Sequence, residues 1–275
     1  MNPLGIMQGR LLPKYNERYQ AHPVGYWHEE FSIAAELGLD CVEFILDYND
    51  FQKNPLMTAD GRRKIKFLSD KTGVGVLSIC ADYFMEKPLH SDDEKTALKS
   101  TGVLVDLLNA ASELGIMDVV IPCVDQSSIK TNRIRDRFKE IIHSIIPEAE
   151  KCEVNLSLET DLNPKQFDDL LSQLPYECLT VNYDIGNSAS LGFDFYDELN
   201  VYGDRISDIH IKDRTLNGGS VKLGSGNADI PGFFKLLENY NYKGPFIMQA
   251  YRDDEGKKVF EEQLDWLKYN TGIIC

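Results

Sequence analysis

Short runs of apolar residues recur along the chain, separated by segments in which apolar and polar positions alternate with a helical period. Several of the runs are apolar at consecutive positions, as expected for parallel strands that are buried on both faces. The pattern predicts eight strands, at residues 5–9, 41–46, 75–82, 119–123, 155–160, 179–185, 206–212 and 246–251.

Residues that start and stop helices lie between these runs. Gly115 follows an Ala- and Leu-containing segment, at the position after a helix where a positive φ is common. Ser91 with Glu94 forms a capping-box pattern, and Asn163 before Pro164 forms an N-cap followed by proline at the first helical position. The segments between the strands are therefore predicted to be helices.

Alternation of strand and helix, repeated eight times with right-handed crossovers, closes most simply as a (β/α)8 barrel. A doubly wound open sheet is the alternative, but it would need a glycine-rich fingerprint after the first strand, and residues 9–13 do not provide one. No linker or low-complexity segment divides the chain. We therefore expect residues 1–275 to form a single α/β barrel domain, a size typical of this fold.

Composition narrows the functional classes. The formal net charge of -15 argues against binding to nucleic acid or to an anionic membrane, because both need a basic surface. Six cysteines occur without a CxxC pair, which favours a reducing compartment over a disulfide framework. No apolar run approaches the ~18 residues of a membrane span. The sequence thus predicts a cytoplasmic protein with a small-molecule partner.

Chemically capable residues stand at the ends of four consecutive predicted strands. The fifth ends with Glu159, the sixth with Asp184, the seventh with His210 and the eighth with Gln249. The carboxyl ends of barrel strands meet at one rim, where α/β barrels carry their active sites. Two carboxylates, an imidazole and an amide oxygen suit a divalent cation that keeps positions open for substrate oxygens. Each residue alone has an ordinary structural explanation, and it is the joint pattern that favours a metal centre.

Six segments carry a resemblance to a known family, at residues 5–11, 42–44, 158–159, 184–187, 210–213 and 223–226. In these segments the chain resembles the sugar phosphate isomerase/epimerase family of xylose isomerase-like TIM barrels, and the resemblance extends over essentially the whole chain. It implies a carbohydrate substrate and one divalent metal ion bound by Glu159, Asp184, His210 and Gln249. Mn²⁺ is the expected ion, with Co²⁺, Mg²⁺ and Zn²⁺ as alternatives.

Two positions depart from the family pattern. Epimerases of this type use two metal-bound glutamates that exchange protons with opposite faces of the substrate; Glu159 matches the first, but Gln249 cannot act as a proton base. These enzymes also tend to carry a histidine three residues after the metal-binding aspartate, where this chain has Asn187. The departures argue against two-base epimerisation of a ketose.

A single base still permits isomerisation of an aldose and a ketose through a cis-enediolate, with a metal as Lewis acid. Glu159 would be that base, and Lys212 could supply a proton or positive charge near the developing oxyanion. The alternative for Lys212 is a scaffold ion pair with Asp213 or Glu159. Dehydration of a sugar or polyol on the same metal site, and a non-catalytic sugar-binding barrel, remain alternatives for the whole protein.

The other candidate site residues are substrate-binding ones. Arg10 and Arg252 follow the first and last strands and could reach an anionic or hydroxylated substrate, with surface ion pairing as the alternative. Asn187 is a substrate-binding candidate by its place in the family motif. Glu43 is a polar residue in an apolar strand, so it needs a partner inside the barrel mouth, either substrate or protein.

Two further alternatives are addressed by the sequence. A barrel endonuclease for abasic DNA is disfavoured, since it would need several strand-end histidines and only His210 is one. The glycine-rich segment 223–229 could cradle a phosphate, but an ordinary turn with Asp229 as N-cap is favoured because that carboxylate would repel the anion. Association into a homo-oligomer is left open.

Overall fold

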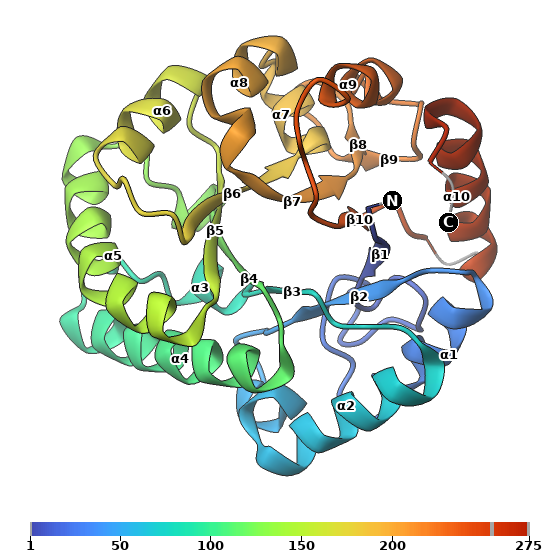
Figure 1. Ribbon diagram of the computed structural model, residues 1–275, viewed down its shortest axis with the longest axis horizontal. Coiled ribbons are helices and arrows are strands. Elements are labelled where there is room, and N and C mark those ends of the chain that lie inside the picture. The colour runs from blue at the N-terminus through green and yellow to red at the C-terminus, as the bar shows by residue number, and fades with distance from the viewer. Residues whose placement is uncertain (1, 254–255, 274–275) are drawn as a thin grey trace.

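The computed structural model describes residues 2–253 and 256–273, and they form a closed barrel of eight parallel strands (Figure 1). Neighbouring strands follow the order β1-β10-β7-β6-β5-β4-β3-β2, so that β1 closes the ring between β2 and β10. Each of the eight predicted strands is present, which confirms the (β/α)8 fold. The barrel strands are β1 (Leu4–Met7), β2 (Cys41–Ile45), β3 (Ser78–Cys80), β4 (Asp118–Cys123), β5 (Asn155–Thr160), β6 (Leu179–Asp184), β7 (Ile206–Ile211) and β10 (Phe246–Met248).

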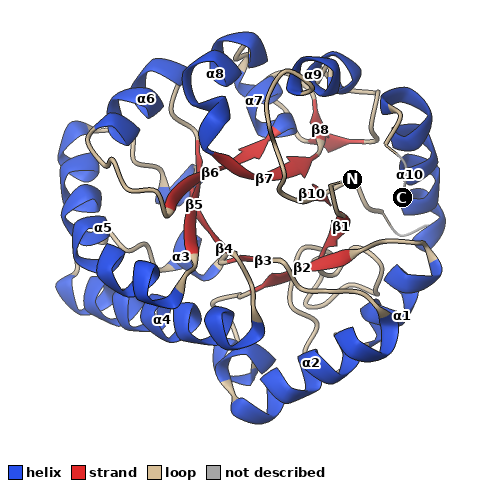
Figure 2. Cartoon of the chain, viewed as in Figure 1, coloured by secondary structure: helices blue, strands red, loops and turns tan. Residues whose placement is uncertain are grey.

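Helices surround this ring on its outer side (Figure 2). No helix within the described residues has both the length and the apolar character needed to cross a membrane. The α-helices are α1 (Glu29–Glu36), α2 (Ala59–Thr72), α3 (Tyr83–Glu86), α4 (Glu94–Leu114), α5 (Asn132–Cys152), α6 (Pro164–Ser172), α7 (Ile185–Leu191), α8 (Phe195–Tyr202), α9 (Ile230–Leu237) and α10 (Lys257–Thr271). Short 3₁₀ helices are η1 (Phe51–Lys53), η2 (Pro55–Met57), η3 (Asp125–Ser127) and η4 (Gly203–Arg205).

The structure differs from the predicted elements in two places. The third strand is shorter than predicted, because Gly75 makes only an isolated bridge to Cys41 and regular pairing begins at Ser78. After β7 the chain also forms an antiparallel pair, β8 (Asp213–Arg214) and β9 (Ser220–Val221), which was not predicted. Strands of two residues are too short to produce a periodic pattern.

Helix ends follow local chemistry. Gly115 ends α4 with a φ of 71°, and Asn163 Oδ1 accepts a hydrogen bond from Gln166 N at the start of α6, as predicted. The prediction of Ser91 as the N-cap of α4 is wrong. Asp93 is the N-cap, since its carboxylate accepts from Thr96 N at 3.2 Å and also places negative charge at the positive end of the helix.

The interior of the barrel is apolar on one side and polar on the other. The apolar side is a small buried cluster of Met7, Cys41, Ile45, Cys80 and Ile247. On the polar side, below the candidate site, the Asp118 carboxylate accepts from Ser207 Oγ at 2.6 Å and from Asn155 Nδ2 at 3.1 Å. Buried polar groups of this kind persist because they are hydrogen-bonded. The candidate site therefore stands on a polar floor.

Candidate active site

Three of the predicted metal ligands converge at the carboxyl ends of β5, β6 and β7. Asp184 and His210 are direct partners in the register of β6 with β7, so their side chains leave the sheet at the same depth. Glu159 joins them from β5, and one ligand atom from each of the three residues lies within 4.8 Å of the others. All three side chains are buried. The register of a parallel sheet thus assembles a compact oxygen and nitrogen set.

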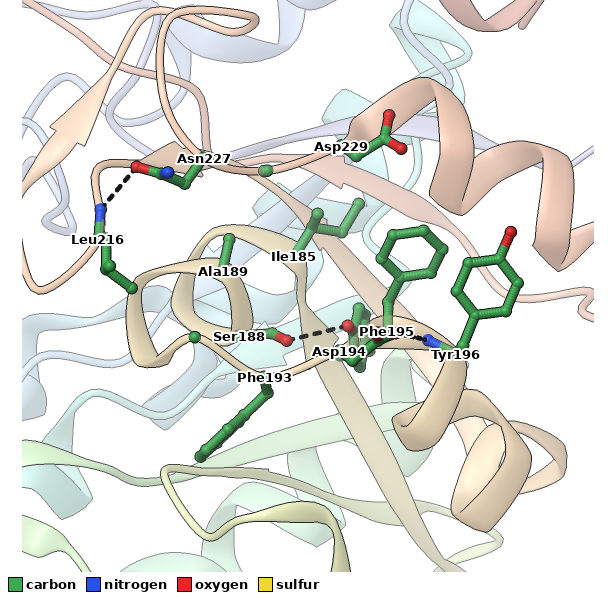
Figure 3. Close-up of a pocket in the computed structure, with 13 residues that line it drawn as sticks. Ile185, Ser188, Ala189, Phe193, Asp194, Phe195, Tyr196, Leu216, Asn227 and Asp229 are labelled. Carbon is green, nitrogen blue, oxygen red and sulfur yellow. Dashed lines mark hydrogen bonds between the residues drawn. The ribbon is translucent and has the colours of Figure 1, made fainter.

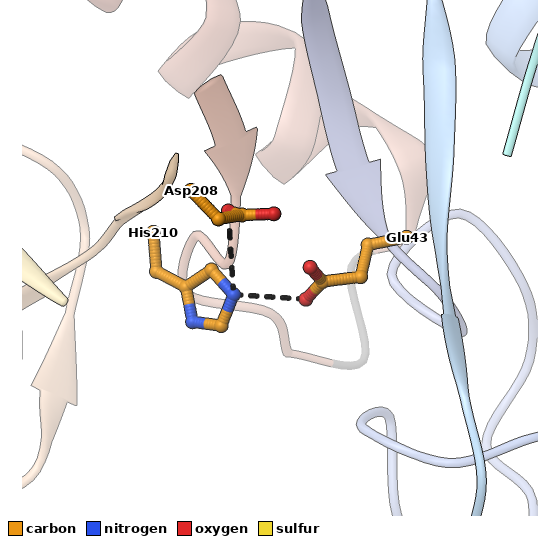
Figure 4. A group of neighbouring side chains, drawn as sticks. All are labelled: Glu43, Asp208 and His210. Carbon is orange, nitrogen blue, oxygen red and sulfur yellow. Dashed lines mark ion pairs between the residues drawn. The ribbon is translucent and has the colours of Figure 1, made fainter. Parts of the chain in front are cut away.

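His210 is held from below by Glu43 (Figure 4). Its Nε2 lies 2.8 Å from Glu43 Oε1 and 3.9 Å from an Asp208 carboxylate oxygen, and neither Glu43 nor His210 is exposed. Ser78 Oγ donates to the other oxygen of Glu43 at 2.5 Å. Within the described residues, His210 Nδ1 has no hydrogen-bond partner. A histidine whose outer nitrogen is engaged by a carboxylate is oriented to bind a metal through the other nitrogen.

Charge in this buried set is balanced by proximity. Burial opposes protonation of His210, but the Glu43 carboxylate, followed by Asp208, raises the pKa of His210 to about 10. Burial raises the pKa of Asp208 well above its usual range, and repulsion from Glu43 adds to the rise. A cation at His210 Nδ1 would displace the proton there, because metal binding requires the unprotonated nitrogen.

Gln249, the fourth predicted ligand, directly follows β10. Its side chain is buried, and Nε2 donates to Gln20 Oε1 at 2.9 Å. Among the described residues, Gln249 Oε1 has no hydrogen-bond donor. A buried amide oxygen without a donor carries a desolvation cost, and a cation is one partner that would remove it.

The residues present fit a divalent cation. Two carboxylates, an imidazole nitrogen and an amide oxygen are ligands that such ions accept, and two of these four groups offer buried atoms that lack a partner. The fit comes from the donor chemistry and from the orphaned atoms His210 Nδ1 and Gln249 Oε1 together.

Asn187 links the carboxylates to two cationic side chains. Its Nδ2 donates to Glu159 Oε1 at 2.6 Å, while its Oδ1 accepts from Arg214 Nη1 at 2.8 Å and from Lys212 Nζ at 3.3 Å. Lysine and arginine can only donate, so they fix the amide with its NH₂ group toward Glu159. The Asp184 carboxylate accepts from the backbone N–H of Asn187 and caps α7.

Lys212 pairs with Asp184, its Nζ lying 3.3 Å from Oδ2. The alternative of a scaffold pair with Asp213 or Glu159 is wrong, because successive residues of an extended chain point to opposite sides. Asp213 instead accepts hydrogen bonds from the backbone N–H groups of Gly226 and Ala228, and so anchors the loop before α9.

Glu159 has the protonation behaviour of a base that works near neutral pH. Burial raises the pKa of Glu159 to about 7, and the neighbouring Asp184 carboxylate adds to the rise, whereas His210 and Lys212 lower it. A carboxyl group with a pKa near 7 can both take up and release a proton at neutral pH. A bound cation would shift that pKa downward.

The two predicted substrate-binding arginines meet at the other side of the rim. Arg252 Nε donates to the carbonyl oxygen of Arg10 at 2.7 Å, and the Arg252 guanidinium lies over the ring of Tyr19, 4.4 Å from its centroid. Burial lowers the pKa of Arg10 to about 10, with partial compensation from Asp82 and Glu30, so the guanidinium keeps its charge at neutral pH. The structure thus places two cations at the mouth of an acidic protein.

Several residues near the site were not predicted. Asp82 follows β3 as Asp184 ends β6, so the rule that selected Asp184 would also have selected Asp82. Arg214 belongs to the unpredicted pair of short strands, and Gln20 lies in the loop after β1, where no sequence pattern marks it.

A separate pocket of about 440 Å³ lies beside α7 and α8 (Figure 3). Phe193, Phe195, Tyr196 and Leu216 provide apolar walls, and none of the predicted metal ligands lines it. The neighbouring segment 223–229 forms a turn, and Asp229 Oδ1 accepts from Gly232 N at the start of α9, which confirms the predicted N-cap.

The chain belongs to the xylose isomerase-like TIM barrel family, whose model matches residues 31–270. This confirms the resemblance inferred from the six sequence segments. Among curated proteins, the chain is 28% identical over 271 residues to SgbU of Escherichia coli (strain K12), provisionally named an L-ribulose-5-phosphate 3-epimerase. The match covers 90% of this chain and 94% of SgbU.

Solved structures show the same fold. The apo 3-keto-D-glucoside 4-epimerase YcjR from E. coli matches with a TM-score of 0.77 at 16% identity, covering 98% of this chain and all of that one. A xylose isomerase-like barrel from Mycobacterium smegmatis, solved in complex with magnesium, matches with a TM-score of 0.72 at 17% identity, covering 98% and 97%. The expectation of an isomerase or epimerase agrees with the names of SgbU and YcjR.

A buried histidine near the site provides a test by pH. His22 Nδ1 lies 3.0 Å from Gln8 Oε1, its ring packs near Trp27 and Phe44, and burial lowers the pKa of His22 to about 4. A folded-state pKa below the unfolded value means that the unfolded chain takes up a proton first. This contribution to stability is therefore complete above pH 6.5 and is lost as the pH falls toward 4.

Replacing His22 with glutamine, which can still donate to Gln8, should remove this dependence. The difference in unfolding free energy between the native protein and the variant should shrink by up to ~1.4 kcal/mol per pH unit between pH 6.5 and 4. Urea unfolding at several pH values measures it, and subtraction cancels the opposing titration of buried carboxyl groups such as Glu30, whose pKa is raised to about 7. A difference that stays constant with pH would contradict the prediction.

Proposed function

We propose that the protein is a divalent-metal-dependent sugar isomerase or epimerase that transfers a proton next to a carbonyl through an enediolate, with Glu159 as the base. The observation that supports this best is the convergence of Glu159, Asp184 and His210, with ligand atoms within 4.8 Å of one another. Membership of the xylose isomerase-like family supports the same reaction class.

Glu159, Asp184, His210 Nδ1 and Gln249 Oε1 would hold the metal. When bound, it supplies a Lewis acid that acidifies the carbon next to the carbonyl and stabilises negative charge on substrate oxygens. Mn²⁺ is the ion that we expect, and the magnesium complex of the M. smegmatis barrel supports a divalent ion of this kind. Glu43 would act as a positioning residue for His210, because its contacts are with that ring and with Ser78.

The proton step belongs to Glu159. Its carboxylate would remove a proton from the carbon next to the carbonyl and return it to the neighbouring carbon, so that no other acceptor is needed. Asn187 holds one carboxylate oxygen at 2.6 Å, which limits the orientations of the base. Lys212 lies beside Asp184 and would provide positive charge to the developing oxyanion.

Gln249 favours a single-base route. An amide can offer an oxygen to a metal but cannot accept a substrate proton at neutral pH. Removal and return of the proton by Glu159 on one face of the substrate accounts for isomerisation of an aldose and a ketose. Inversion at a carbon would need a second proton-transfer group on the opposite face.

We propose a phosphorylated sugar as substrate. Arg10 and Arg252 bring two positive charges to the mouth of a protein with a net charge of -15, and an anionic group would be attracted there. Arginine is suited to phosphate because its guanidinium can donate two parallel hydrogen bonds. The name of SgbU, which includes a ketose phosphate, supports this class.

Metal analysis combined with isotope exchange tests the proposal. Protein purified without chelator should contain about one divalent ion, and in D₂O it should exchange a substrate proton for deuterium within a panel of ketose phosphates. EDTA should abolish the exchange and Mn²⁺ should restore it. Unphosphorylated ketoses should react more slowly. Protein that neither binds a divalent ion nor exchanges any proton would refute the proposal, and release of a deoxy keto sugar would identify a dehydratase instead.

A further inference from the structure

The orientation of the Gln249 side chain is set by a chain of contacts that begins outside the metal ligands. Gln249 Nε2 donates to Gln20 Oε1 at 2.9 Å, and Gln20 Nε2 donates to Asp82 Oδ2 at 3.2 Å. Arg10 Nη2 also donates to Gln20 Oε1, at 2.9 Å. Four side chains from the ends of β1, β3 and β10 and from the loop after β1 are thus linked in one network.

The end members of this network leave only one arrangement of its two amides. A guanidinium can only donate, so the Gln20 group that faces Arg10 must be the oxygen. An ionised Asp82 can only accept, so the Gln20 group that faces it must be the NH₂. Since Gln20 then presents oxygen to Gln249, the Gln249 group that faces Gln20 must be NH₂. The oxygen of Gln249 is therefore directed away from Gln20, and it has no donor among the described residues.

We propose that Gln20 and Asp82 are positioning residues, which fix the Gln249 amide so that Oε1 faces the divalent cation site. This inference rests on the proposed metal centre. A carboxylate at position 249 would need no such control, because both of its oxygens can bind a metal. A carboxamide presents either an oxygen ligand or an NH₂ group that repels a cation, so its function depends on its neighbours.

The contacts of Asp82 favour positioning over a direct role at the reacting carbon. Asp82 Oδ2 accepts from Gln20, and Oδ1 accepts from Cys80 Sγ at 3.2 Å. Both carboxylate oxygens therefore already have protein donors. An asparagine at this position could keep its oxygen toward Gln20, so the network needs an acceptor here and not a titrating group.

Calorimetric titration of the full-length, metal-free protein with Mn²⁺ tests the proposal without relying on activity. Gln20→Met keeps the side-chain volume but removes both hydrogen-bonding groups, and it should weaken Mn²⁺ binding by about tenfold, as is typical when a partner of a metal ligand is lost. Asp82→Leu should have a similar effect, whereas Asp82→Asn should leave the affinity near that of the native protein. Thermal unfolding of each variant verifies that the barrel is folded.

A second background separates orientation of the amide from general damage to the site. In Gln249→Glu protein, Gln20→Met should not weaken Mn²⁺ binding, because a carboxylate has no wrong face. Unchanged affinity of Gln20→Met in the native background would overturn the proposal, as would an equal loss in both backgrounds. Loss of substrate proton exchange in Asp82→Asn with native Mn²⁺ affinity would also overturn it, since Asp82 would then act on the substrate.

Failure of the metal centre itself gives a different result. Asp184→Asn should weaken Mn²⁺ binding strongly in either background. If the native protein binds no Mn²⁺, or if Asp184→Asn binds it as well as the native protein does, the proposed metal centre is refuted and the positioning network with it. If the native protein binds and Asp184→Asn does not, the metal centre stands and the Gln20 variants decide the inference.

Discussion

Replacing Glu159 with glutamine is expected to lower kcat by about 10²- to 10⁴-fold, the range for loss of a general base. Glutamine has nearly the same shape and can still offer an oxygen to a metal and to Asn187, but it cannot take a proton from the substrate. The barrel should remain folded, because the side chain is matched in volume. Turnover, exchange of substrate protons in D₂O and thermal unfolding together measure the effect.

The matched control is Asp161→Asn, at the end of the same strand. Asp161 pairs with Lys130 at 2.8 Å and accepts from Ser128 Oγ at 2.6 Å, so its carboxylate is engaged away from the metal ligands. This variant should keep kcat within about a factor of three, as expected of a change in a partly exposed ion pair. Native rates of proton exchange in Glu159→Gln would show that the base is another residue.

The second large effect is expected for Gly9→Ala, which should lower the free energy of unfolding by about 2–4 kcal/mol. Gly9 has a φ of 88°, which alanine adopts only with strain, and a Cβ here would overlap the carbonyl oxygen of Tyr19. The N–H of Gly9 also donates to the buried Glu30 carboxylate, at 2.8 Å from Oε2. The close approach holds the segment that carries Gln20 against the end of β1.

Gly25→Ala provides the comparison for the effect of backbone strain alone. Gly25 has a φ of 97°, but nothing lies within 4 Å of the position that a Cβ would take. We expect it to cost about 1 kcal/mol, from left-handed backbone strain. Chemical denaturation measures both variants. Equal losses would mean that the contact of Gly9 with Tyr19 contributes nothing beyond its φ angle.

The Gly9 contact also bears on the site. If the Tyr19–Ala21 segment moves away from β1, Gln20 moves with it, and the Gln249 amide loses the partner of its NH₂ group. Gly9→Ala should therefore weaken Mn²⁺ binding in the folded protein, in the same direction as Gln20→Met. Stability and metal affinity are coupled here through one short loop.

The barrel itself could be predicted from the sequence because its physical cause is local and repeated. Consecutive apolar residues in each strand report burial on both faces, and residues such as Gly115 and Asn163 report helix ends through their own backbone and side-chain preferences. The exceptions are informative. Asp93 displaced Ser91 as a cap because two neighbouring residues could serve, and a propensity cannot decide between them.

Part of the candidate site was also within reach of the sequence. Glu159, Asp184, His210 and Gln249 each lie at or just past the end of a predicted strand, and in a parallel barrel such positions must meet at one rim. Contacts that depend on side-chain direction were not within reach. The pairing of Lys212 with Asp184 and of Glu43 with His210 follows from which side of each strand faces the barrel interior.

The sequence by itself determined the fold class, the four candidate ligands and the absence of a second carboxylate base at Gln249, because each depends on residue type and on position within a strand. Only the tertiary structure decided how the two amides beside the ligands are oriented. Gln20 and Asp82 lie 229 and 167 residues before Gln249, and Asn187 lies between residues of β5 and β8. A hydrogen bond needs a donor and an acceptor at a defined distance, and only the closed barrel brings them together.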